Sequence, residues 1–174
     1  MLTLLQTLVD IIGLRKGPDA IPHSMALFVI VVGFWLFVDL LGELLIPDLG
    51  TTSISGLIVS LIGLVLFAVI VALDRKNERL LQMMTALIGC GAVLGLVLTI
   101  VIAVMLRFQE FSAVAVLGLM TVWVITLFSI VVDGHILSRT LERPRLYGVI
   151  LAFLVFALQY YLSTAMNPAQ TTAA

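Results

Sequence analysis

Long runs of apolar residues, separated by short polar breaks, make up most of the chain. A transmembrane helix needs about 20 mostly apolar residues to cross about 30 Å of hydrocarbon. Five runs reach this length, and they lie at about 25–46, 52–73, 80–106, 111–132 and 146–166. None of them alternates between polar and apolar residues, and lipid cannot satisfy an open backbone. Each run therefore predicts an α-helix and not a strand of a membrane barrel.

The segment 1–14 has a different pattern. Its polar residues Thr3, Gln6, Thr7 and Asp10 fall at helical spacing on one face, and apolar residues cover the rest. This pattern predicts a short amphipathic helix that lies in the membrane interface. The alternative is a frayed tail.

Composition agrees with a membrane location. The chain has 174 residues, of which 62% are hydrophobic and 11% charged, whereas soluble domains are about 45–50% apolar and about 25% charged. No polar stretch is long enough to fold as a separate aqueous domain. We therefore expect an all-α, polytopic membrane helix bundle. Residues 1–174 would form a single membrane domain of five transmembrane helices and a short N-terminal interfacial helix, with the lipid bilayer as the first partner.

The basic residues predict the orientation. Nine Lys and Arg residues are present, and all but Arg107 fall before the first run, between the second and third, or between the fourth and fifth. The break after the first run contains Asp48 and follows Asp39 and Glu43, with no basic residue. Because basic loops stay inside, we expect a bacterial inner (cytoplasmic) membrane protein with its N-terminus in the cytoplasm and its C-terminus periplasmic or external.

Acidic residues within the apolar runs are candidates for function, because charge in a span is costly. Asp39 and Glu43 are four residues apart and share one face of the first predicted helix. One hypothesis is an acidic site for a cation or a proton. The alternative is that both carboxylates reach the outer interface, where water solvates them.

Asp133 lies at the inner end of the fourth run. It is a candidate functional residue that can pair with Arg75, Lys76 or Arg79 across the cytoplasmic face. We expect such an ion pair to be structural, and the alternative is a catalytic pair.

The fourth helix is predicted to continue past Val132 until Pro144 ends it. His135 and Arg139 belong to one polar face of this extension, together with Ser138 and Glu142.

Small residues indicate where helices approach each other. Gly91 and Gly95 form a Gly-x-x-x-Gly pattern in the third run, and Gly56, Ser60 and Gly63 share one side of the second. Such faces favour close helix packing in lipid. They predict packing within the chain, or alternatively the seam of a homodimer.

Motifs of catalysis and cofactor binding do not occur in the sequence. It has no phosphate-binding loop and no zinc-protease pattern, and its one cysteine, Cys90, has no neighbouring metal ligand. We expect no enzymatic activity, no cofactor, no metal and no nucleic-acid partner.

The layout resembles the small bacterial members of the Yip1 family. The resemblance rests on the basic Gly-Pro segment at Leu14–Pro22, on the five spans, and on Trp123 followed by His135-Ile136-Leu137-Ser138-Arg139. The Asp-Leu-Tyr-Gly-Pro signature and the long N-terminal region of the eukaryotic members are absent. The resemblance implies a non-enzymatic membrane protein that acts through interactions.

The leading functional hypothesis is a scaffold or accessory subunit of a membrane complex, bound to another membrane protein or to itself. The alternative is a small transporter or channel component that uses Asp39 and Glu43. An intramembrane enzyme comes third, because no nucleophile–base pair is visible.

Overall fold

The structure is a computed structural model that describes residues 2–46, 54–108 and 110–166. Asp48, the first residues of the second predicted span and the segment after Met166 lie outside the described residues. Within the described part, the chain folds into helices and short connections, with no strand.

Six α-helices follow one another, with two short 3-10 turns between them. In chain order the elements are α1 (Leu2–Ile12), η1 (Pro18–Ala20), α2 (Met25–Leu45), α3 (Ile54–Leu73), η3 (Asn77–Arg79), α4 (Leu80–Arg107), α5 (Ser112–Leu141) and α6 (Arg145–Met166). Helices α2 to α6 are long and apolar enough to cross a membrane. The prediction of five membrane-spanning helices in an all-helical fold is therefore confirmed.

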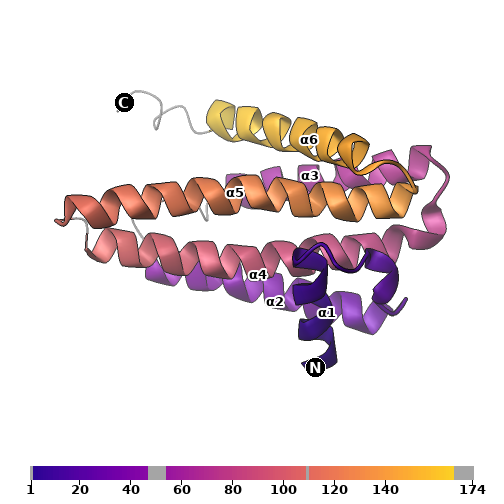
Figure 1. Cartoon of the computed structure of the whole chain (residues 1–174), viewed down its shortest axis with the longest axis horizontal. Coiled ribbons are helices and arrows are strands. Elements are labelled where there is room, and N and C mark those ends of the chain that lie inside the picture. The colour runs from indigo at the N-terminus through magenta and orange to yellow at the C-terminus, as the bar shows by residue number, and fades with distance from the viewer. Residues whose placement is uncertain (1, 47–53, 109, 167–174) are drawn as a thin grey trace.

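Helices α4 and α5 are the long central pair of the bundle (Figure 1). Helix α2 packs against α4, α6 packs against α5, and α3 packs mainly against α6. Although α2 and α3 follow each other in the chain, they do not form a comparable contact with each other. The described parts of α2 and α3 are therefore not closed against each other.

The buried core lies at one end of the bundle, where the α3–α4 and α5–α6 connections meet. It contains Met83, Cys90, Val132 and Ile136, whose side chains are almost fully buried. In contrast, the described part of α5 has no buried side chain before Ile130. Elsewhere the exterior carries many exposed large apolar side chains, such as Leu117 at 67% exposure. Lipid is the solvent that such a surface requires.

The N-terminal segment packs across this same end (Figure 1). Leu8 and Ile11 of α1 are buried, and the Cys90 thiol lies 3.9 Å from the carbonyl oxygen of Leu8. The Gln82 amide donates a hydrogen bond of 2.7 Å to the carbonyl oxygen of Ile21. Both α1 and the residues that follow it are thus fastened to α4.

Three helices end on the same backbone motif. Leu14, Arg75 and Glu142 have a φ of 58°, 58° and 56°, and the next residue in each case donates a hydrogen bond to the carbonyl five residues earlier. This left-handed C-terminal cap usually contains glycine. The predicted continuation of the fourth run past Val132 is confirmed, because α5 runs to Leu141 and ends on the Glu142 cap.

Candidate functional site

Two adjoining cavities lie beside α2, and the inner one extends from α2 to α3. The outer cavity has a volume of about 320 Å³ and lies between α2 and α4, with Trp35, Asp39 and Thr99 in its lining. The inner cavity has a volume of about 150 Å³ and brings together α2, α3, α4, α5 and α6. Trp35 and Gly91 line both cavities. We call the two cavities together the α2–α3 groove.

Gly91 and Gly95 both line the outer cavity, but only Gly91 has no neighbouring helix beside it. At Gly91, no atom of a neighbouring helix would lie within 4 Å of an added Cβ, and at Gly95 the nearest atom is Val38 Cγ1 at 3.9 Å. The prediction that Gly91 packs against another helix of this chain is therefore wrong, whereas the distance from Gly95 to Val38 of α2 is an ordinary van der Waals contact and agrees with packing within the chain. The homodimer seam remains a prediction, since the structure contains one chain.

The closest helix contact instead joins Gly134 of α5 to Gly148 of α6. A Cβ on Gly134 would lie 2.5 Å from the Cα of Val149, and a Cβ on Gly148 would collide with the carbonyl oxygen of Gly134. Sequence reasoning missed this pair. The signal for it was present, because Gly134 and Ser138 are four residues apart, and so are Gly148 and Ala152.

On α3, the three predicted small residues have different surroundings. Gly63 is buried against the Gln159 side chain of α6, whose amide donates a 3.2 Å hydrogen bond to the carbonyl oxygen of Val59. Ser60 lines the inner cavity beside Gln159, whereas Gly56 is half-buried outside that lining. The Gly63 contact therefore joins α3 to α6 at the floor of the groove.

The two acidic residues of α2 also have different surroundings. Asp39 is half-buried and lines the outer cavity, as Thr99 does. Glu43 is exposed and lines neither cavity of the groove. A shared acidic site of Asp39 and Glu43 within the groove is thus not formed.

Asp133 lines the inner cavity and has no ion-pair partner among the described residues. The expected ion pair with Arg75, Lys76 or Arg79 is therefore wrong. The reason is that Asp133 lies two helical turns before the end of α5, whereas Lys76 and Arg79 belong to the α3–α4 connection beyond that end.

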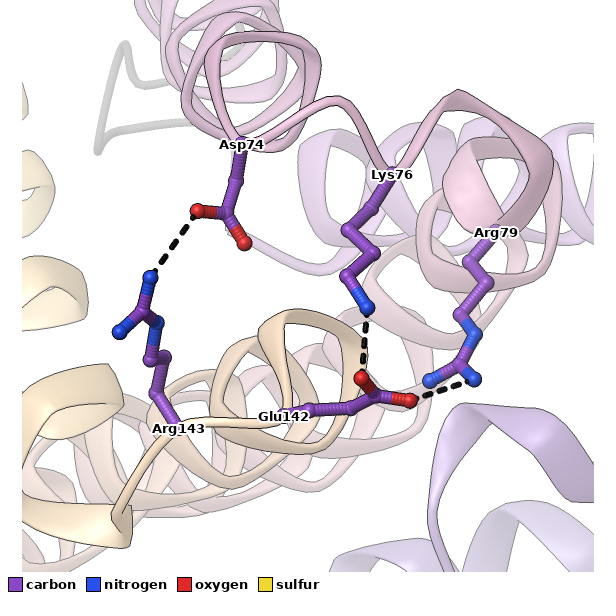
Figure 2. Close-up of polar contacts among 5 residues, drawn as sticks. All are labelled: Asp74, Lys76, Arg79, Glu142 and Arg143. Atoms are coloured by element: carbon purple, nitrogen blue, oxygen red, sulfur yellow. Dashed lines mark hydrogen bonds and ion pairs between the residues drawn. The ribbon is translucent and has the colours of Figure 1, made fainter.

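Lys76 and Arg79 instead form ion pairs with Glu142 at the end of α5 (Figure 2). Its carboxylate lies 2.6 Å from Lys76 Nζ and 2.7 Å from Arg79 Nη2. The hydrogen bond from Lys76 is the main reason why the pKa of Glu142 falls below its usual value, and the charge of Arg79 adds to it. Nearby, Arg143 Nη2 lies 3.4 Å from Asp74 Oδ1. The α3–α4 and α5–α6 connections are thus joined by charge.

His135 and Arg139 lie beneath the N-terminal segment. The His135 ring is buried, and its Nε2 lies 2.9 Å from the carbonyl oxygen of Lys16. Because a carbonyl can only accept, Nε2 must carry the proton, and Nδ1 is left without a partner among the described residues. Arg139 is exposed, but its aliphatic stem lies against Gly17. The polar face predicted for the end of α5 therefore contacts the N-terminal segment of the same chain.

These features define a class of protein, namely a multi-pass helical membrane protein with a groove open on one side of its bundle. In comparisons with family models, curated proteins and solved structures, nothing matches this chain.

Proposed function

We propose that this chain is a non-enzymatic scaffold or accessory subunit of a complex in the bacterial inner membrane, and that it binds another membrane protein along the α2–α3 groove. Support comes from the open wall at Gly91, where the chain leaves space that its own helices do not fill. Helices associate in lipid where small residues let their backbones approach. The resemblance to the Yip1 family stays a prediction, and it agrees with a role in interactions.

We also propose that the N-terminus faces the cytoplasm. The ion pairs of Glu142 and Asp74 and the bond from His135 to Lys16 place three basic segments at one end of the bundle. Arg107 ends α4 at the other end. Since basic segments remain on the cytoplasmic side, α6 leads outwards and the C-terminus is external.

Helix α1 suits the cytoplasmic interface because it has three faces. Leu8 and Ile11 face the bundle, Leu5 and Val9 are exposed apolar residues, and Asp10 belongs to the polar face. At 1.5 Å per residue, α4 with 28 residues and α5 with 30 residues are about 42 and 45 Å long, which exceeds a 30 Å hydrocarbon core by two to three turns. If this excess lies on the cytoplasmic side, the membrane boundary falls near Asp133, at the level of α1.

The single observation that carries the proposal is the empty space at Gly91, and it gives a direct test. A leucine there projects into the groove from a position where no atom of a neighbouring helix lies within 4 Å of its Cβ. Gly33, on the face of α2 turned away from the groove, also has nothing within 4 Å and supplies the matched control. Affinity purification from native membranes in mild detergent should recover a fixed partner with the wild type and with Gly33→Leu, but not with Gly91→Leu. Equal recovery with all three proteins, or no fixed partner, would contradict the proposal.

A second candidate, a small transporter or channel component, is favoured by one observation. The two cavities adjoin at Trp35, with Asp39 in the outer one and Asp133 in the inner one. In proteoliposomes this hypothesis predicts a measurable ion or proton flux that Asp39→Asn abolishes. Because Glu43 lies outside the groove, Glu43→Gln should leave the flux unchanged.

A further inference from the structure

We propose that the inner half of the α2–α3 groove binds a transmembrane helix of a partner protein that places a Lys or Arg side chain against Asp133. This inference rests on the proposed function, and it specifies the chemistry of the partner.

The carboxyl group of Asp133 has no basic partner among the described residues. The Asp133 side chain is half-buried and lines the inner cavity. No hydrogen bond or ion pair joins it to another described residue. A carboxylate that leaves water without a partner costs several kcal/mol, and a cation placed beside it offsets that cost.

Four of the nine basic residues of this chain form ion pairs among the described residues, and none of these pairs involves Asp133. Lys76 and Arg79 bind Glu142, Arg143 binds Asp74, and Lys16 binds Asp10 at 2.8 Å. Within α2 and α3, which border the groove, no Lys or Arg occurs. Helices α2 and α3 therefore supply no cation to Asp133. The proposed cation belongs to a partner protein, and photocrosslinking distinguishes such a partner from a second copy of the chain.

The residues around Asp133 also favour the close approach of a helix. Beside Asp133, the inner cavity is lined by Ser60 and Gly91, two small residues on opposite walls. Small residues permit close approach of a helix backbone. The long stem of Lys or Arg lies well along apolar surface such as Leu87 and Ile88 while its charged end reaches a polar boundary. An acyl chain would also fit this space, but it would leave the carboxylate without a counter-charge.

Photocrosslinking tests the proposal on the full chain in native membranes. A benzophenone amino acid at Ser60 should form an adduct with a partner peptide from an apolar span that contains Lys or Arg. The same label at Gly33 should not form this adduct. An adduct with a phospholipid, with a second copy of the chain, or with a span that lacks a basic residue would overturn the inference, and these results need no variant of Asp133.

Charge variants give the second arm. Asp133→Asn should reduce the recovered partner at least tenfold, whereas Asp133→Glu should retain it, and Glu43→Gln is the matched control outside the groove. Exchanging the charges, with Asp133→Lys in this chain and Asp in place of the basic residue of the partner, should restore recovery. If Asp133→Asn keeps full recovery while Gly91→Leu loses it, the groove binds a partner without this ion pair. The proposed function then stands and the inference fails.

Discussion

The α5–α6 contact and the α2–α3 groove use glycine in opposite ways. At Gly134 and Gly148, two backbones approach so closely that neither position has room for a Cβ. At Gly91, the same residue type faces a cavity and meets no neighbouring helix. A glycine in a membrane helix therefore indicates a surface that can be approached, and its surroundings decide whether the chain itself or another molecule approaches it.

The connections of the helices help to explain the difference. Three residues, 142–144, separate α5 from α6, and such a short turn makes two helices antiparallel neighbours. Helices α2 and α3 are also consecutive, but each packs against a different helix of the bundle. The groove is the consequence of these separate contacts.

The largest expected effect on stability comes from a larger side chain in the contact between α5 and α6. Gly134→Leu must push the backbone of Val149 away, because a backbone cannot rotate aside as a side chain can. We expect a loss of about 3 kcal/mol in the free energy of unfolding, at the upper end of what overpacking costs. Unfolding in mixed detergent micelles with increasing SDS measures this loss.

The matched control for Gly134→Leu is the same substitution at Gly91, which lines the groove. Gly91→Leu should change the free energy of unfolding by no more than about 0.5 kcal/mol, as for an unconstrained surface site. If the two variants were equally stable, or if Gly91→Leu were the less stable one, the distinction between a closed and an open glycine would be lost.

The sequence predicts the spans and some candidate residues, but it does not predict which glycines form helix contacts. The five spans follow from the length of the apolar runs, because lipid admits few other structures. Asp39 and Asp133 could be named as candidates because charge within a span is rare. Which glycine meets which helix could not be predicted, since it depends on how each helix is rotated toward its neighbours. The surroundings of His135 were missed for a similar reason, because its partner Lys16 is 119 residues away in the chain.

A smaller effect on the free energy of unfolding is expected at the contact between α6 and α3, beside the groove. The Gln159 amide donates to the carbonyl oxygen of Val59 and so connects α6 to α3. Gln159→Leu removes this bond, and we expect a loss of about 0.6 kcal/mol, the average for a hydrogen bond between membrane helices. The same SDS titration measures it. Thr164→Val is the control, because Thr164 bonds only within its own helix. An effect as large as that of Gly134→Leu would show that the floor of the groove, and not the glycine contact, holds α6 in place.

The smallest effect should come from the ion pairs at the turn between α5 and α6. The exposed carboxylate of Glu142 bonds Lys76 and Arg79, and surface pairs of this kind contribute little to stability. The pKa of Glu142 in the folded protein lies below its usual 4.5, chiefly because of the Lys76 hydrogen bond. Folding therefore favours the charged form, and the pairs stabilise the protein fully above about pH 4.5 and progressively less as the pH falls through the lowered pKa. Melting temperatures in detergent should thus be slightly lower for Glu142→Gln than for the wild type at pH 7, and this difference should vanish under acid. Glu78, which is exposed and has no ion-pair partner among the described residues, gives the control variant Glu78→Gln. A difference that grew on acidification, or that matched the loss in Gly134→Leu, would mean that charge, and not the contact of two backbones, closes this side of the bundle.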